Sequence, residues 1–197
     1  AMCNLQPDQK AMGVPPHWMS YISVENADNA AEKATSLGAK VLMGAFDVMD
    51  VGRMAVIQDP QGAVFCVWQP KAHIGAKLVG ETGTFGWGEL WTTDRKKGAQ
   101  FYTGLFGWGS KEGDMGEMGV YTEWQNGGQS IGGMMQMTPD MGPIPPNWLP
   151  YFMVDDCDAV ANKAAATGGK LNVPPTDIPN VGRFSVIQDP QGAVFAI

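Results

Sequence analysis

Apolar residues change their spacing in a regular order between residues 86 and 137 of this 197-residue chain. They alternate with other residues over 86–93, which predicts a strand, and Asp94 then suits a helix N-cap. From 101 to 106 they recur at helical spacing until Gly107, a residue type that commonly ends helices. Two further apolar runs, 120–125 and 129–137, flank Asn126-Gly127-Gly128, and Asn-Gly between such runs is typical of a hairpin whose central residues take positive φ. The pattern predicts a strand, a helix and then further strands.

This plan recurs, because a long stretch of sequence is repeated. Residues 51–65 and 181–195 share the run Val-Ile-Gln-Asp-Pro-Gln-Gly-Ala-Val-Phe, and the offset (189 − 59 = 130) persists back to Pro15 and Pro145. A constant offset without gaps indicates one supersecondary unit used again. We therefore expect modules over 17–68, 84–140 and 141–197, with the polar, glycine-rich stretch 70–83 as a linker.

The two ends of the chain fall inside this repeat. Residues 1–8 resemble 133–140, which lead into the next copy, so residue 1 corresponds to a position near the end of a module. We expect 1–69 to be the second half of an N-terminal domain that lacks its first module, and 84–197 to be a complete C-terminal domain. A half domain with an open sheet edge is expected to self-associate, as a homo-oligomer or an aggregate.

Composition narrows the class of partner. The chain has 20 Asp and Glu against 13 Lys and Arg, a net charge of −7, and 44% hydrophobic residues. This acidic balance argues against nucleic acid or an anionic membrane as partner, because both require clustered Lys and Arg. The three cysteines, Cys3, Cys66 and Cys157, share no metal or disulfide spacing, which favours free thiols and a cytoplasmic location.

Two sequence features carry a resemblance to a known family. One is the helix that follows Asp94 and runs through Phe101-Tyr102 into Leu105-Phe106-Gly107-Trp108; the other is the Asp-Pro-Gln-Gly turn before a module's last strand. In this order they resemble the vicinal oxygen chelate superfamily, which includes glyoxalases, bleomycin resistance proteins and extradiol dioxygenases. The resemblance implies an α+β fold of repeated βαβββ modules in tandem domains, whose curled mixed sheets surround a cleft.

The resemblance also implies where a divalent metal would bind. Metal-dependent members carry His, Gln or Glu on the first strand of a module and Glu on the last strand. The corresponding positions here offer neither oxygen nor imidazole and hold Met19, Cys66, Trp87, Leu149 and Ala196. Since divalent zinc, nickel and iron need such donors, we expect no metal cofactor. A zinc, nickel or iron site at other positions is the alternative.

Period-two alternation predicts what lines the cleft instead. The residues expected on the cleft face, in the three modules, are Trp87, Glu89 and Trp91, then Leu149, Tyr151 and Met153, and finally Tyr21. This aromatic and methionine-rich lining suits a flat or apolar small molecule. Glu89 would lose hydration between two tryptophans and could serve there as a general base or a cation anchor. Alternatively, Glu89 is a structural carboxylate that pairs with an arginine or accepts from backbone donors.

Arg183 also has two interpretations. It occupies the same repeat position as Arg53, in Val-Gly-Arg before a strand, and it would contact an anionic ligand. Alternatively, each arginine orients its own module by pairing with an aspartate nearby in the sequence, Asp189 or Asp59.

Three functional hypotheses stay open. The first is a metal-independent, glyoxalase-like protein that binds a small organic ligand in an aromatic cleft. The second is an enzyme: a lyase or isomerase with Glu89 as base, or a metal-dependent, dioxygenase-like activity with the ion at other positions. The third is a resistance protein that sequesters a cationic aromatic drug. Replacing Glu89 by Gln separates them, since this change abolishes turnover if Glu89 is a base, weakens binding if it is an anchor, and does neither if it is structural.

Overall fold

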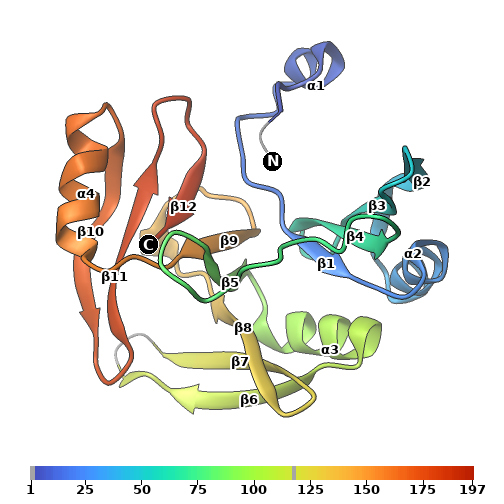
Figure 1. Ribbon diagram of the computed structural model, residues 1–197. Helices are drawn as coiled ribbons and strands as arrows, with labels where there is room; N and C mark the ends of the chain where they lie inside the picture. Colours follow the sequence, from blue (N-terminus) through green and yellow to red (C-terminus); the bar gives the residue numbers. More distant parts are fainter. Residues whose placement is uncertain (1–2, 117–118) are drawn as a thin grey trace. The chain divides into compact units, whose positions relative to one another are not determined.

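The computed structural model describes residues 3–116 and 119–197 (Figure 1), and within them strand, helix and three strands follow one another three times. The first module contains β1 (Tyr21–Ser23), α2 (Ala27–Ser36), β2 (Lys40–Val48), β3 (Gly52–Gln58) and β4 (Val64–Pro70). The second contains β5 (Phe85–Thr92), α3 (Arg95–Phe106), β6 (Gly109–Asp114), β7 (Val120–Asn126) and β8 (Gln129–Gln136). The third contains β9 (Asn147–Phe152), α4 (Cys157–Ala166), β10 (Lys170–Ile178), β11 (Gly182–Gln188) and β12 (Val194–Ala196). The α+β fold of repeated βαβββ modules is thus as expected.

In the part of the chain that the structure describes, two short helical segments lie outside the modules. The helix α1 (Pro7–Ala11) precedes the first module, and a 3₁₀ turn at Pro139–Met141 precedes the third. None of the helices in the described ranges is long and apolar enough to span a membrane.

The chain divides into two compact units. The first unit joins Ala1–Trp18 and Gly80–Gly86 to Pro150–Ile197, and the second joins Met19–Val79 to Trp87–Leu149. The second unit therefore contains two modules that the sequence pattern placed in different domains. Its core contains buried residues from both modules, among them Ile57, Phe65, Tyr102 and Trp124. The β1–β4 and β5–β8 modules consequently share one hydrophobic core, while the expected domain boundaries stay a prediction.

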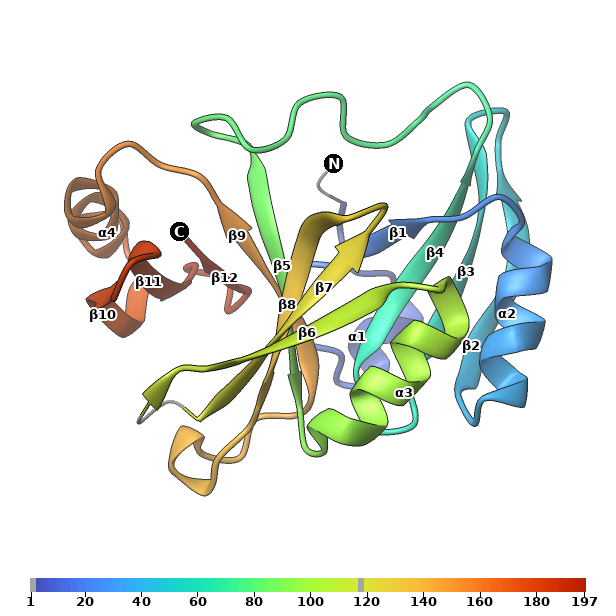
Figure 2. The ribbon, with the colours of Figure 1, turned by 90° about the horizontal axis from the view of Figure 1, so that it is seen from below.

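The strands of the two modules in the second unit belong to different sheets. In the first, the strand order is β1-β4-β3-β2, with β1 parallel to β4 and the other pairs antiparallel. In the second, β5 pairs in parallel with β8, and β7 and β6 follow as antiparallel neighbours. Helices α2 and α3 contact each other, and Figure 2 shows them side by side. Helix α2 also contacts β2 and β3, and α3 contacts β6 and β8, so each helix covers one face of its own module's strands.

The first unit has a smaller core. Strands β10, β11 and β12 form an antiparallel ladder, and Tyr151 of β9 pairs in parallel with Ala196 of β12. Helix α4 lies against β10 and β11 and buries Cys157 and Ala161 together with Ile187. Small residues let the helix approach the ladder closely, which suits this alanine-rich sequence.

Helix α3 begins and ends where the sequence predicts. The Asp94 carboxylate accepts a hydrogen bond from the backbone N–H of Lys97 at 3.1 Å, and so caps the first turn. Gly107 ends the helix with φ of 72°, a conformation that costs glycine little.

Two details of the β5–β8 module differ from the prediction. The turn between β7 and β8 is centred on Gly127 and Gly128, both with positive φ, because Asn126 still pairs with Gln129. The prediction of a hairpin is thus confirmed, but the centre of its turn lies one residue later than the Asn-Gly pair indicated. Strand β6 has no apolar alternation, since all six of its residues are exposed, and its backbone pairing with β7 alone defines it.

Candidate functional site

Strand β5 places three predicted site residues on one face. Trp87, Glu89 and Trp91 alternate along the strand with residues that face the helix side. Of the latter, Leu90 and Thr92 are fully buried, and Leu90 joins the shared core. The alternation therefore directs Trp87, Glu89 and Trp91 to the face opposite α3, as predicted.

Glu89 is the buried acid of this face, with 7% of its surface exposed. Its Oε1 accepts a hydrogen bond from Trp91 Nε1 at 2.6 Å, and its Oε2 accepts one from Tyr121 Oη at 2.8 Å. The Tyr121 hydroxyl in turn accepts from Trp87 Nε1 at 2.9 Å. The donors of these two hydrogen bonds to Glu89 are therefore aromatic side chains. The interpretation of Glu89 as a structural carboxylate expected an arginine or backbone N–H groups instead. We call Trp87, Glu89, Trp91 and Tyr121 the Glu89 cluster.

Tyr121 is the member of the cluster that sequence reasoning missed. It lies on β7, and its side chain crosses over β8 to reach Glu89. A Cβ atom on Gly133 of β8 would overlap the Tyr121 hydroxyl, so the crossing needs glycine at this position. Two sequence features could have indicated Tyr121: the alternation within 120–125, and the pair Gly132-Gly133 on the neighbouring strand. Burial, and then the charge of Glu89, raise the pKa of Tyr121, so its phenol keeps the proton that it donates.

A second acid shares this face of the sheet. Glu89 pairs with Gly133, and Gly133 pairs with Glu123, so the three residues form one row across β5, β8 and β7. Glu123 accepts hydrogen bonds from Ser130 Oγ at 2.5 Å and Gln125 Nε2 at 3.3 Å. The bond from Ser130 is the main cause that lowers the Glu123 pKa. The face thus carries two carboxylates, of which Glu89 is the more buried.

The remaining predicted lining residues have different surroundings. In the second unit, Leu149 is buried at 2% exposure, and Tyr21 is 54% exposed with its ring edge toward Trp68 at 6.3 Å between centroids. In the first unit, Tyr151 is half-buried, and Met153 is 44% exposed. Of the predicted lining residues, Trp87, Glu89 and Trp91 are thus the ones that belong to the hydrogen-bonded Glu89 cluster.

Arg183 makes the contacts of a structural arginine. Its Nε and Nη2 donate to the Asp158 carboxylate at 2.6 and 2.9 Å, and its Nη1 donates to Asp177 at 2.9 Å. Asp158 lies in the first turn of α4 and Asp177 on β10, so the guanidinium ties the helix to the ladder. The partner expected from the sequence, Asp189, was wrong, because its carboxylate instead accepts three backbone N–H groups of its own turn.

Arg53 repeats this arrangement in the β1–β4 module. It donates two hydrogen bonds to Asp28, at 2.7 and 2.8 Å, and one to Asp47 at 3.2 Å. The expected partner Asp59 was wrong here too, since it accepts from its own turn and from Tyr102. The repeated arginine is explained by a repeated helix anchor.

These ion pairs predict a dependence of stability on pH. Hydrogen bonds from Arg53 and Arg183 are the main cause that lowers the pKa of Asp28 and Asp158 below the ordinary 3.8. Each pair therefore stabilises the fold above pH 3.8, and this stabilisation is lost as the pH falls through the lowered pKa. We expect Arg183→Ala to flatten the drop in melting temperature on acidification through this range. An acid slope equal to that of the unmodified protein would contradict the assignment.

The described residues do not fit a divalent metal. Residues 3–116 and 119–197 contain no group of three or more His, Cys, Asp or Glu that could hold an ion. Cys66, the one donor at a position that the resemblance assigns, is buried, and burial raises the pKa of its thiol to about 12. Since thiolates rather than thiols bind metals, Cys66 is a poor ligand as it stands. We therefore derive no chemistry through a metal at these positions.

Comparisons with known proteins agree with the fold and extend it. The family model described as Glyoxalase/Bleomycin resistance protein/Dioxygenase superfamily matches residues 80–197. "Putative glyoxylase CFP32" of Mycobacterium bovis is 44% identical over 185 residues, which are 94% of this chain and 70% of the relative. "Anthracycline biosynthesis protein DnrV" of Streptomyces peucetius is 34% identical over 192 residues, 97% of this chain and 68% of the relative.

A solved structure supports the architecture independently. The Mn(II)-bound glyoxalase from Novosphingobium aromaticivorans superposes with a TM-score of 0.61 at 17% identity, and the match covers 89% of this chain and 60% of that one. At this identity the likeness concerns the fold alone. The family model and the relatives show that the chain belongs to the glyoxalase/bleomycin resistance protein/dioxygenase superfamily.

Proposed function

We propose that this chain binds a small organic ligand against the Glu89 cluster, with Glu89 as the polar anchor. The observation that carries the proposal is a nearly buried carboxylate whose two oxygens each accept a hydrogen bond from an aromatic side chain. Three aromatic rings supply flat apolar surface, and one fixed charge supplies orientation. Small-molecule sites commonly combine these two properties.

The hydrogen bonds favour an anchor over a general base. Trp91 and Tyr121 each stabilise the negative charge that proton abstraction would consume. They also fix the direction of the carboxylate, which suits recognition of an N–H or cationic group. Because the donor set does not fit a metal, the proposed binding is metal-independent.

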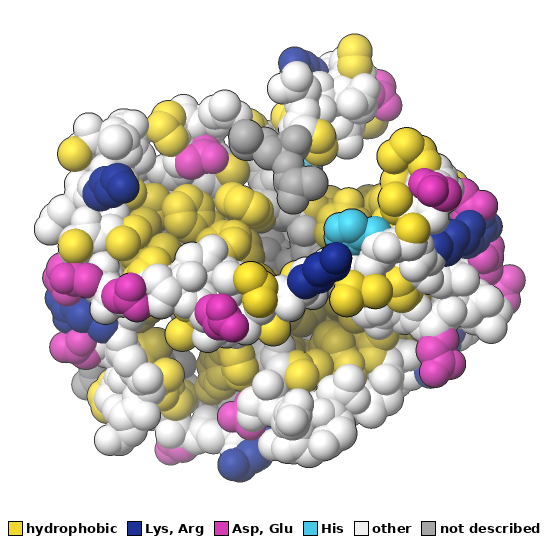
Figure 3. Space-filling view, in the orientation of Figure 1, with side chains coloured by type: hydrophobic (Ala, Val, Ile, Leu, Met, Phe, Trp, Pro, Cys, Tyr) yellow, Lys and Arg dark blue, Asp and Glu magenta, His cyan; other side chains and the backbone are white. Residues whose placement is uncertain are grey.

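Surface charge supports a small molecule as the partner. On the face in Figure 3, Lys and Arg side chains lie singly among Asp and Glu, whereas a nucleic-acid site would gather positive charge. Cys3, Cys66 and Cys157 are all free, which supports the expected reducing, cytoplasmic location. The expected self-association is part of the same proposal and is checked by sedimentation.

An anthracycline is a suitable first probe, because one relative is named for anthracycline biosynthesis and such compounds combine a flat ring system with a cationic amine. We expect daunorubicin to bind saturably, measured by quenching of tryptophan fluorescence. Glu89→Gln removes the charge and one acceptor, and should weaken this binding about tenfold, the value of one charge-assisted contact. Glu32→Gln, a charge change on the exposed side of α2, should leave it unchanged.

Isomerase chemistry is the second candidate, because another relative is named as a glyoxylase. The same variant separates the two. If the protein turns over the hemithioacetal of methylglyoxal and glutathione, and Glu89→Gln abolishes turnover while daunorubicin still binds with full affinity, Glu89 is a base. Absence of saturable binding by both proteins would contradict the anchor proposal.

A further inference from the structure

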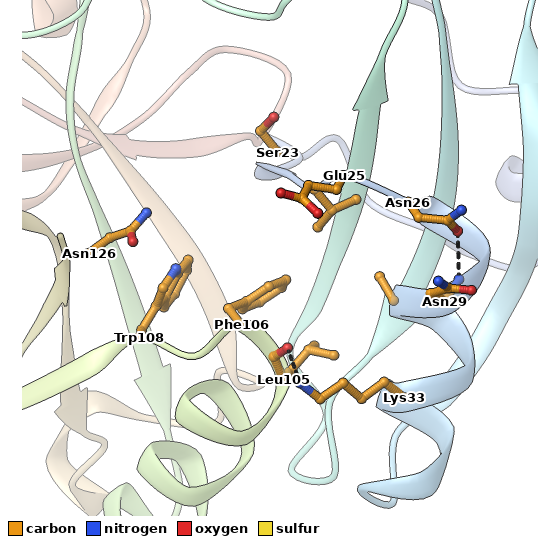
Figure 4. A pocket seen from close by; sticks show the side chains of 11 residues that line it. Ser23, Glu25, Asn26, Asn29, Lys33, Leu105, Phe106, Trp108 and Asn126 are labelled. Carbon is orange, nitrogen blue, oxygen red and sulfur yellow. Dashed lines mark hydrogen bonds between the residues drawn. The ribbon is translucent and has the colours of Figure 1, made fainter.

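A pocket of about 470 Å³ opens in the second unit between the start of α2 and the end of α3 (Figure 4). One wall comes from the segment 23–33, and the other comes from Leu105, Phe106 and Trp108, with Asn126 at the rim. It shares no residue with the Glu89 cluster. Its volume falls within the range of sites that bind small organic molecules.

Two stacked rings form the floor of this pocket. Phe106 and Trp108 lie on either side of Gly107, whose positive φ reverses the chain, and their centroids are 4.7 Å apart at an interplanar angle of 30°. Trp108 also lies parallel to the buried Tyr102, at 13° and 6.3 Å. The floor is therefore held by the core beneath it. The helix ends of the other two modules read Leu37-Gly38-Ala39 and Thr167-Gly168-Gly169, so this aromatic pair occurs at one helix end of the three.

Lys33, the lysine among the described lining residues, is already engaged. Its Nζ donates to the Leu105 carbonyl at 3.0 Å, near the end of α3. Carbonyls at a helix C-terminus carry partial negative charge and favour a cation there. Lys33 thus joins the two walls, and its ammonium is directed to the α3 end of the pocket.

An uncommitted carboxylate lies on the wall across from the rings. Glu25 is exposed and points into the space beside Trp108 and Phe106 in Figure 4. Within residues 3–116 and 119–197, no hydrogen bond or ion pair engages its carboxylate, and the same holds for the side-chain amide of Asn126. The neighbouring acid Asp28 differs, because Arg53 holds it. The pocket therefore offers an aromatic surface, one free negative charge and one free amide.

We propose that this pocket is a second binding site, for a planar cation of the amidinium, guanidinium or protonated heterocycle type. Such a group is attracted to the face of a tryptophan ring and donates two parallel hydrogen bonds to a carboxylate. Trp108 provides the ring, Glu25 provides the carboxylate, and the Asn126 carbonyl oxygen is a further acceptor. An anionic ligand would be repelled by Glu25.

Benzamidine is the probe that tests this site, and its oppositely charged analogue benzoate is the comparison. The indole N–H resonance of Trp108, assigned with Trp108→Phe, is followed in proton–nitrogen NMR spectra during titration. We expect benzamidine to shift it saturably and benzoate not to. Glu25→Gln should weaken benzamidine binding about tenfold. Asp155→Asn, the matched change at the same repeat position (155 − 130 = 25), should leave it unchanged.

Each outcome decides the proposal. No saturable shift of Trp108, an equal response to benzoate, or unchanged affinity in Glu25→Gln would overturn it. Glu89→Gln distinguishes this pocket from the proposed site at the Glu89 cluster, because the variant should leave the benzamidine response of Trp108 intact. Loss of that response in Glu89→Gln would assign the signal to the Glu89 cluster and would also overturn the second site.

Discussion

Replacing Asp59 by alanine is expected to lower the free energy of unfolding by about 3–4 kcal/mol, because it leaves several buried groups without partners. Asp59 is 3% exposed, and its Oδ1 accepts the backbone N–H groups of Gln61, Gly62 and Ala63 at 2.8 to 3.0 Å. Its Oδ2 accepts from the fully buried Tyr102 hydroxyl at 3.0 Å. The donors of Gln61, Ala63 and Tyr102 would lose their acceptor at once, while the Gly62 N–H would keep its second acceptor, the Asp59 backbone carbonyl at 3.1 Å.

The repeat supplies a matched control for this experiment. Asp189 accepts the same three backbone donors in the last turn of the chain, at 2.8 to 2.9 Å, but its side chain is more exposed. Water can reach that turn, so Asp189→Ala should cost about 1 kcal/mol. Urea unfolding measured by tryptophan fluorescence gives both values. Equal losses in the two variants would contradict a special role for the buried copy.

The larger effect at Asp59 comes from a chain of hydrogen bonds that crosses three modules. Trp148 Nε1 donates to Tyr102 Oη at 2.9 Å, and Tyr102 donates to Asp59. Burial raises the pKa of Tyr102 well above its ordinary value, so the hydroxyl stays a donor. The turn of the β1–β4 module is thus fixed to α3 of the next module and to the start of β9.

The sequence predicted the modules because their information is local. Asp94 begins α3 and Gly107 ends it, and both act through contacts within a few residues. The repeat of 51–65 in 181–195 implied a repeated structure. Strand β6 was not visible, since an exposed edge strand needs no apolar alternation. Its position follows from pairing with β7, which no local pattern records.

The candidate site was predictable on one strand and not across strands. Alternation along β5 placed Trp87, Glu89 and Trp91 on one face, because a strand has a fixed period of two. Tyr121 joins them through the register of β5, β8 and β7, which the sequence does not specify alone. The partners predicted for Arg53 and Arg183 were wrong for a similar reason. Sequence proximity suggested Asp59 and Asp189, whereas the fold brings Asp28 and Asp158 from the helices.

Gly133→Ala is expected to dismantle the Glu89 cluster without touching its polar residues. The backbone of Gly133 has no positive φ, so alanine is compatible with the chain, but its Cβ would overlap the Tyr121 hydroxyl and ring. Tyr121 must then move, and its hydrogen bonds with Glu89 and Trp87 are lost. We expect a loss of about 2–3 kcal/mol in unfolding free energy, and weaker ligand binding.

A glycine in the same sheet controls for this substitution. Gly113 of β6 also lacks positive φ, and a Cβ there would meet no atom within 4 Å. Gly113→Ala should therefore change stability by less than about 0.5 kcal/mol, or raise it slightly by restricting the unfolded chain.

A double-mutant cycle assigns the cause of the Gly133 effect. In a Tyr121→Ala background the overlapping ring is gone, so Gly133→Ala should cost little, and the coupling between the two positions should account for most of the single-variant loss. The Trp87 indole resonance gives a second readout, because it loses its acceptor when Tyr121 moves. If Gly133→Ala is equally costly with and without Tyr121, the glycine is required by the backbone of β8. In that case the Tyr121–Glu89 hydrogen bond is not what demands glycine at this position.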